Sequence, residues 1–137
     1  MSFEFAARVA ASRIDSATWF GLSGERVTGD AVAAHLAAAA QLMRRDNWDP
    51  QVYGPGSYRQ LVDALRQVRL DALHDEDTQM VGVDLLEQIL AAHLGAPFVD
   101  LDVWQDKAAR TLPEVLDLLA TAAAFARRYG PRMALAA

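Results

Sequence analysis

Apolar residues recur at helical spacing over most of the chain, and this periodicity predicts four principal helices. Each expected helix has a stripe of apolar residues on one face and polar residues on the other. The predicted helices cover about residues 31–46, 57–73, 78–95 and 111–129. The residues expected to face inward are Val32, Leu36, Ala39, Leu42, Met43, Leu61, Val62, Leu65, Val68, Leu73, Val81, Leu85, Leu86, Ile89, Leu90, Leu94, Leu112, Val115, Leu116, Leu119, Ala122, Ala123 and Ala126.

Capping residues stand at the expected ends of these helices. Ser, Thr or Asp at a helix start accepts a hydrogen bond from a free backbone amide, and Glu or Gln three residues later completes a capping box. Glycine after the last turn satisfies the final carbonyls, and proline prevents continuation. The predicted starts are Asp30, Ser57 with Gln60, Thr78, and Thr111 with Glu114, and the predicted stops are Gly95 and Gly130-Pro131.

The N-terminal part of the chain has a less regular pattern. Phe3 to Ser12 predicts a short helix, whereas Thr18–Leu22 and Arg26–Thr28 flank Ser23-Gly24 as the two strands of a small hairpin would. An isolated hairpin is only marginally stable, so we expect this segment to lean on the helices.

The length of 137 residues suits one domain, and no repeat or linker is long enough to divide it. We predict an all-α fold in the main: a compact bundle of four principal helices over residues 31–130, preceded by the less regular residues 1–30. The stretches Ala37–Ala40 and Ala120–Ala124 allow helices to approach closely. One of these stretches could therefore remain exposed as the surface of a homodimer.

Composition and charge exclude several classes of site. The chain has no cysteine, which excludes disulfides, thiolate metal sites, iron–sulfur clusters and a cysteine nucleophile. Thirteen basic and eighteen acidic residues leave a net charge of −5, the wrong sign for general binding to nucleic acid. No segment has the length of a membrane span and no export signal is recognised, so we expect a cytoplasmic protein.

The segment from Phe98 to Asp106 combines aromatic residues with carboxylates between two predicted helices. One interpretation makes this segment the rim of a ligand pocket. The alternative, which we favour, is that Phe98 and Trp104 fill the core while Asp106 caps a turn or pairs with Arg110. The residues of the candidate pocket are Trp48, Asp102, Trp104 and Asp106.

Histidines and acidic residues offer few other candidates. Residues 74–77, His-Asp-Glu-Asp, lack the alternating oxygen ligands and central glycine of a calcium loop, so we favour a solvated surface loop. His35 and His93 could approach each other in a bundle, yet neither belongs to a recognised ligand spacing. The serines and glycines stand in no nucleophile elbow or phosphate-binding loop. We therefore predict no catalytic residue, no metal and no cofactor.

Two pairs of arginines stand at the ends of predicted helices, Arg44 with Arg45 and Arg127 with Arg128. Bases at helix C-termini interact favourably with the helix dipole and need no ligand. If the two helix ends are adjacent in space, the pairs would form a local positive patch. Such a patch could bind an acidic protein surface or, less favoured for a protein of this net charge, a nucleic acid.

Four short motifs follow one another from residue 31 onward. They are Arg45-Asp46-Asn47-Trp48, Leu61-Val62-Asp63-Ala64-Leu65, Val103-Trp104-Gln105-Asp106, and Arg110-Thr111 with Glu114-Val115. In order and spacing they resemble a family of small actinobacterial and actinophage-associated proteins catalogued as a domain of unknown function. That family usually has glycine before the first tryptophan, and cysteine and glycine where Gln60 and Asp63 stand. The resemblance implies a helical fold and a bacterial or phage origin, and it implies no activity.

These observations favour a non-catalytic binding or regulatory protein that acts through a protein partner, with self-association as a homodimer as a further option. The expectation follows from the missing catalytic and cofactor motifs, since helix caps and core account for most of the informative residues. One alternative is a small-molecule-binding protein or small enzyme with a pocket near Trp104. Another is a DNA-associated regulator that uses the arginine pairs.

Overall fold

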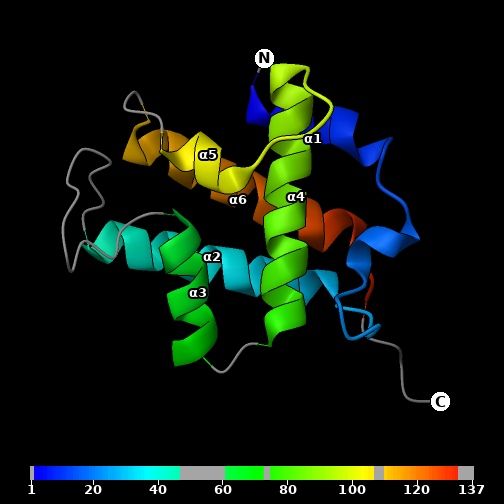
Figure 1. Cartoon of the computed structure of the whole chain (residues 1–137), viewed down its shortest axis with the longest axis horizontal. Coiled ribbons are helices and arrows are strands. Elements are labelled where there is room, and N and C mark those ends of the chain that lie inside the picture. The colour runs from blue at the N-terminus through cyan, green and yellow to red at the C-terminus, as the bar shows by residue number, and fades with distance from the viewer. Residues whose placement is uncertain (1, 47–60, 73–74, 107–109, 133–137) are drawn as a thin grey trace.

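The computed structural model describes residues 2–46, 61–72, 75–106 and 110–132 (Figure 1). Within these ranges the chain forms six α-helices, a short 3-10 helix and no strand, so the predicted mainly α-helical fold is confirmed. The α-helices are α1 (Phe3–Ala11), α2 (Gly29–Asp46), α3 (Leu61–Asp71), α4 (Glu76–Leu94), α5 (Leu101–Gln105) and α6 (Leu112–Tyr129). The 3-10 helix η1 covers Ser16–Trp19. The four principal predicted helices correspond to α2, α3, α4 and α6.

The antiparallel helices α2 and α6 lie side by side, and α4 crosses both of them (Figure 1). The backbone amide of Gly29 donates to the carbonyl of Pro131 at 2.8 Å, so the start of α2 lies against the end of α6. A β-carbon at Gly29 would overlap the backbone of Ala126 and Gly130. Glycine at this position therefore lets the two helix ends meet at backbone distance.

The start of α2 differs from the prediction. The helix begins at Gly29, which places Asp30 inside its first turn. The hydroxyl of Thr28 accepts a hydrogen bond from the amide of Ala31 at 3.2 Å, and the Thr28 carbonyl accepts one from Val32 at 3.2 Å. Thr28 is therefore the residue that caps α2, and the assignment of Asp30 as the cap was wrong. Asp30 still suits its place, because a carboxylate near a helix N-terminus interacts favourably with the dipole.

The start of α4 also differs from the prediction. Asp75 is the N-cap, and its carboxylate accepts a hydrogen bond from the Thr78 amide at 2.6 Å. Thr78, predicted as the cap, lies buried inside the first turn. Of the predicted acidic loop, Glu76 and Asp77 belong to the helix itself. The predicted end is confirmed, since Gly95 has the left-handed φ of 65°.

The start of α6 is confirmed. The hydroxyl of Thr111 accepts a hydrogen bond from the Glu114 amide at 3.3 Å, and proline stands in the first turn, where helical amides lack partners. The carboxylate of Glu114 instead pairs with Arg110 at 3.2 Å. The other predicted capping box, Ser57 with Gln60, lies outside the described residues.

The N-terminal segment is partly as predicted. The short helix is confirmed as α1. The hairpin is present only as a turn closed by one antiparallel bridge between Phe20 and Arg26, and the two predicted strands do not form. The residues before the bridge form η1 instead of a strand, and the buried side chain of Trp19 fixes them to the bundle. Ser23 hydrogen-bonds to the carboxylate of Asp77 at the start of α4. The turn thus leans on a helix, as expected.

Most of the residues predicted to face inward are buried, but the stripe is not complete. Leu94, expected in the core, is 52% exposed. Leu118 and Phe125 of α6 are buried and were not predicted, because α6 contacts neighbours on more than one side. His35 is fully buried on α2 beside Gly82 of α4. No helix in the described part of the chain combines the length and apolarity that crossing a bilayer requires.

Candidate partner-binding groove

A group of carboxylates gathers where α5 folds back against α4. Asp84 and Glu87 stand three positions apart on α4 and therefore share one helix face. Asp100 is the N-cap of α5, where its side chain accepts a hydrogen bond from the Asp102 amide at 2.9 Å. Asp102 follows in the first turn of α5. Residues far apart in sequence thus form one acidic surface.

Two hydrogen bonds hold α5 against its neighbours. The carboxylate of Glu87 accepts a hydrogen bond from the backbone amide of Leu101 at 2.8 Å, which ties the start of α5 to α4. The side-chain carbonyl of the buried Gln105 accepts one from the amide of Val62 at 2.9 Å, which ties the end of α5 to α3. The five residues of α5 are too few to form a stable helix alone, so these contacts determine its position.

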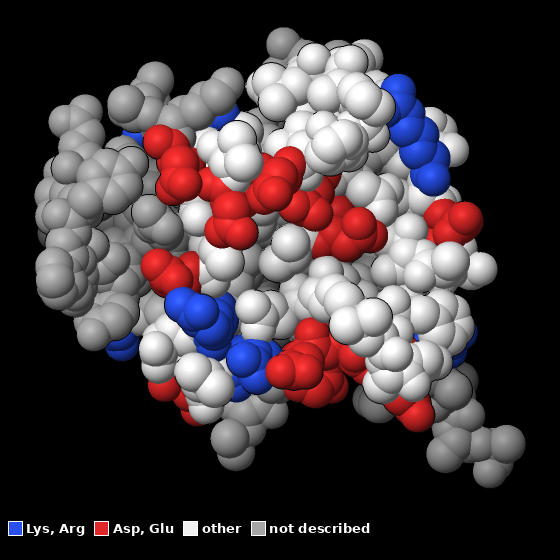
Figure 2. All heavy atoms as spheres, in the orientation of Figure 1, with Lys and Arg blue, Asp and Glu red and all other residues white. Residues whose placement is uncertain are grey.

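The acidic groove is a hollow of about 340 Å³ between α4 and the segment that leads into α5. Its lining consists of Asp84, Glu87, Gln88, Ala91, Pro97, Phe98, Val99 and Asp100. This lining includes carboxylates and no basic side chain. Phe98 is 78% exposed at the groove, so the favoured interpretation, which placed it in the core, was wrong for this residue. Figure 2 shows acidic side chains gathered on this face of the molecule.

Burial raises the pKa of two of these carboxylates, and repulsion from neighbouring carboxylates adds to the rise at Glu87. Desolvation raises the pKa of Asp84, and a hydrogen bond from Gln88 partly opposes the rise. Desolvation also raises the pKa of Glu87, where the hydrogen bond from Leu101 lowers it and the charges of Asp100, Asp84 and Asp102 raise it further. A cationic group placed in the groove would relieve this repulsion, because an opposite charge favours the ionised form of a carboxylate.

Among the residues that the structure describes, no group of three or more His, Asp or Glu side chains converges in a way that could hold an ion. Asp100 and Glu87 each use an oxygen to accept a backbone hydrogen bond. The groove combines negative charge with an exposed aromatic ring, which suits a basic and apolar segment of another protein.

Residues 27–125 match a family of unknown function (DUF6197), and this span exceeds half of the chain. The chain belongs to this family. No curated protein and no solved structure matches it. The DUF6197 span includes all of α2 to α5 and most of α6, and therefore every carboxylate of the acidic groove, whereas α1 precedes it.

Within the DUF6197 span, the structure describes three of the four candidate pocket residues of the sequence, Asp102, Trp104 and Asp106. Trp104 is 3% exposed, and the guanidinium of Arg110 stacks 3.9 Å from the centre of its ring. Arg110 also donates through Nε to the carbonyl of Trp104 at 2.8 Å. Asp102 and Asp106 are exposed on α5 and just after it, and Trp48 lies outside the described residues. Arg110 therefore closes over Trp104 and holds it in the core.

The two arginine pairs are not brought together. Arg44 and Arg45 lie exposed in the last turn of α2, and Arg127 and Arg128 lie exposed in the last turn of α6. Because α2 and α6 run antiparallel, these turns stand at opposite ends of the helix pair, on the order of 25 Å apart at 1.5 Å per residue. The single positive patch that adjacent ends would have formed is absent from this arrangement of described residues.

The two candidate histidines are also kept apart. His35 lies beside Gly82 of α4, whereas His93 is eleven positions further along that helix, roughly 16 Å away at the α-helical rise. The ring of His93 instead contacts Phe3 of α1, with 4.7 Å between the ring centroids. His93 is thus part of the contact between α1 and α4.

Sequence reasoning found only part of the acidic groove. Phe98 and Asp100 belong to the segment that it singled out, but Asp84 and Glu87 were passed over as polar positions of a helix. Their spacing of three on α4 was the available signal. This spacing indicates a site only once the structure shows that α5 folds back on that face of α4.

Proposed function

We propose that the protein is a non-catalytic binding protein that acts through a protein partner, and that the acidic groove binds a basic, apolar segment of that partner. The observation that carries the proposal is the combination of three carboxylates, Asp84, Glu87 and Asp100, with the exposed ring of Phe98 around one hollow. Protein–protein interfaces are enriched in aromatic residues, and a charged surface at an interface faces a surface of opposite charge on the partner.

The electrostatics support a cationic partner. Burial raises the pKa of both Asp84 and Glu87, and the charges of neighbouring carboxylates raise that of Glu87 further. An arginine or lysine entering the groove would stabilise that charge, and the gain would appear as binding energy. The same charges steer a basic partner toward the groove during encounter.

The resemblance to actinobacterial and actinophage-associated proteins suggests where the partner belongs. We infer that the protein acts in the cytoplasm of a bacterium, in a phage or mobile-element context, as a regulator without catalysis of its own. The family itself carries no established activity that would name the partner.

The test compares partner capture from a GC-rich bacterial lysate by the wild-type chain and by a groove variant. The variant carries Asp84→Asn and Glu87→Gln in the lining of the groove, and Asp102→Asn, whose charge acts on Glu87 from beside it. These substitutions remove charge and keep side-chain shape and hydrogen-bonding oxygens. A matched control carries Glu4→Gln, Asp63→Asn and Asp71→Asn, which remove equal charge from α1 and α3. We expect a stoichiometric protein that binds the wild type and the control but not the groove variant.

Phe98→Ala then tests the apolar half of the surface. Since aromatic residues carry much of the energy at interfaces, this variant should weaken binding of the captured protein by about tenfold in a calorimetric titration. A partner that binds the groove variant and Phe98→Ala as tightly as the wild type would contradict the assignment of this surface. Capture of a small molecule or a nucleic acid alone would contradict the protein-partner proposal.

A further inference from the structure

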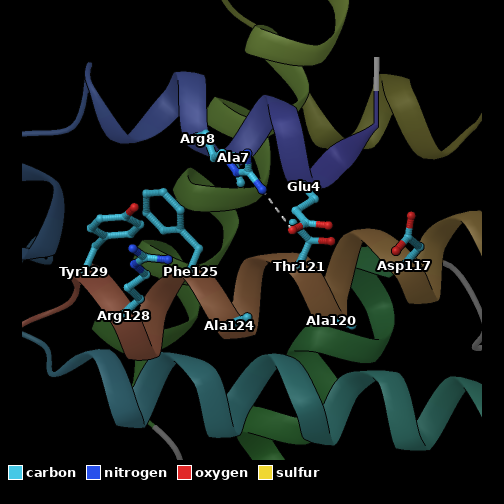
Figure 3. Close-up of a pocket in the computed structure, with 10 residues that line it drawn as sticks. All are labelled: Glu4, Ala7, Arg8, Asp117, Ala120, Thr121, Ala124, Phe125, Arg128 and Tyr129. Atoms are coloured by element: carbon cyan, nitrogen blue, oxygen red, sulfur yellow. Dashed lines mark hydrogen bonds and ion pairs between the residues drawn. The ribbon is translucent and has the colours of Figure 1, made fainter.

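A second groove lies on another side of the molecule, between α1 and α6 (Figure 3). It encloses about 400 Å³, with α1 as one wall and the outer face of α6 as the other. Its lining consists of Glu4, Ala7, Arg8, Asp117, Ala120, Thr121, Ala124, Phe125, Arg128 and Tyr129. We call it the α1–α6 groove.

The outer face of α6 has charged residues at the two ends and small residues between them. Asp117 stands at one end of the groove and Arg128 at the other, about three helical turns away, and both are exposed (Figure 3). Ala120, Thr121 and Ala124 lie between them. These small side chains leave room for another helix to approach, because the distance between packed helices depends on the side chains at the contact.

The two end charges have no partner within the described part of the chain. No ion pair joins Asp117 or Arg128 to another described residue, and the guanidinium of Arg128 only leans over the ring of Tyr129 at 5.4 Å. On the α1 wall, by contrast, Glu4 and Arg8 pair with each other at 3.3 Å. The free charges of the groove are thus one acid and one base, both on α6.

The outer face of α6 has an acid at one end and a base at the other, so two antiparallel copies of it are complementary in charge. If a second copy of α6 lies antiparallel, with the crossing point midway between Thr121 and Ala124, each Thr121 faces the copy's Ala124. The same placement brings each Asp117 beside the copy's Arg128, because the two residues are equally far from the crossing point. A dimer with this two-fold axis therefore contains two Asp117–Arg128 ion pairs, one at each end of the contact.

We propose that the α1–α6 groove binds a second copy of this chain through α6, forming an isologous two-fold dimer. Such an interface uses the same patch on both subunits, so it requires a surface that is complementary to itself. Asp117 and Arg128 supply that property, and the small residues between them allow the helices to meet. The proposal is independent of the acidic groove, whose charges are all of one sign.

Sedimentation analysis of charge-reversed variants tests this pairing. Asp117→Arg gives a surface with two bases at the proposed contact, and Arg128→Asp gives one with two acids. Each variant alone should dimerise more weakly than the wild type by more than about tenfold, since like charges placed together at an interface oppose association. Mixed in equal amounts, the two variants should form a heterodimer, because every contact then joins an acid to a base.

Arg44→Asp is the matched control, since it reverses an exposed arginine in the last turn of the other long helix of the pair. It should dimerise as the wild type does, and helical circular dichroism should show that all variants fold. A wild-type chain that stays monomeric at millimolar concentration overturns the proposal, and leaves the groove to some other occupant. So does a dimer that neither single reversal weakens, or a mixture that does not associate.

Discussion

The acidic groove and the α1–α6 groove are similar in size and differ in how their charges are distributed. The first gathers carboxylates around an exposed phenylalanine. The second places one acid and one base at the two ends of a row of small residues. A surface with charge of one sign repels its own copy and attracts an opposite surface, whereas a surface with both signs in reversible order can bind itself. Charge order therefore separates a site for a different partner from a site for a second copy.

The two grooves also differ in their structural support. The acidic groove depends on the short α5, which a few side chains hold in place. The α1–α6 groove rests on two longer helices, and α6 is packed closely along α2. Substitutions that act on one support should therefore affect one groove and spare the other.

The largest expected effect is on the support of the α1–α6 groove. Gly29→Ala introduces a β-carbon into the backbone of Ala126 and Gly130, which cannot move aside as a side-chain end can. We expect this change to lower the free energy of unfolding by about 2–3 kcal/mol, at the upper end for overpacking. Denaturant titration measures the loss, and the dimer should weaken with it.

Gly82→Ala is the matched control for that prediction. A β-carbon at Gly82 would lie 3.4 Å from a terminal methyl group of Leu36, which can adjust. Alanine also favours a helix interior over glycine by roughly 1 kcal/mol. The variant should therefore be neutral or slightly more stable, and a loss equal to that of Gly29→Ala would contradict the explanation by close backbone approach.

The next effect is on the support of the acidic groove. Arg110→Ala removes the guanidinium that covers Trp104, donates to its carbonyl and pairs with Glu114. The side chain of Arg110 is only 13% exposed, so we expect a loss of about 1.5–2 kcal/mol in the free energy of unfolding, at the lower end of the range for a hydrogen bond that involves a charged group. Partner binding should weaken while dimerisation is retained.

Arg66→Ala serves as the comparison for Arg110→Ala. Arg66 also pairs with a nearby acid, Asp63, but its side chain is 59% exposed. Exposed ion pairs contribute little, so the change should cost less than about 0.5 kcal/mol by thermal denaturation. Equal losses from the two variants would show that the stacking on Trp104 contributes nothing.

Salt should distinguish the two grooves directly. Between 0.1 M and 1 M salt the screening length falls from about 10 Å to about 3 Å. Binding of a basic partner to the acidic groove should weaken by roughly tenfold over this range, because several carboxylate–cation attractions contribute to it. The dimer, with two ion pairs and a row of small residues, should change by only about two- to threefold. Titration and sedimentation at both salt concentrations measure the contrast.

The smallest expected effect concerns pH. The raised pKa of Glu87 means that the folded protein binds a proton more readily than the unfolded chain. Stability therefore decreases as the pH rises from the ordinary glutamate pKa through the raised one, and the penalty persists at higher pH. Glu87→Gln removes it and keeps an oxygen to accept the bond from Leu101. We expect a gain of about 0.5 kcal/mol or less at neutral pH, within the usual range for surface changes.

Melting curves recorded between about pH 4 and pH 7 would check this, because carboxylates titrate at the lower end of that range. The wild type should lose more stability than Glu87→Gln as the pH rises. Identical pH profiles for the two proteins would show that folding does not disfavour the charged form of Glu87.

Local signals in the sequence predicted the helices better than the residues that begin them. Periodicity located α2, α3, α4 and α6, and the Thr111 cap and the Gly95 end were read correctly. Thr28 and Asp75 were missed because several neighbouring residues have capping side chains. Only the direction in which the chain enters each helix selects among them.

The sites depended more heavily on contacts that no local pattern encodes. The charged and aromatic segment around Asp102 and the alanine-rich face of α6 could be seen in the sequence. The sequence did not show that Asp84 and Glu87 lie beside this segment. Nor did it show that α1 forms a wall beside the face of α6. The arginine pairs show the same limit, since their separation follows from the antiparallel packing of α2 and α6.

The sequence by itself therefore determined a helical protein, its long helices and its lack of thiolate chemistry, because hydrophobic periodicity, capping and composition act over a few residues. The tertiary structure alone decided which charges meet, because the position of α5 on α4 and of α1 on α6 results from side chains packing across distant parts of the chain. Charge order at a surface is a product of that packing, and it is what distinguishes the two grooves.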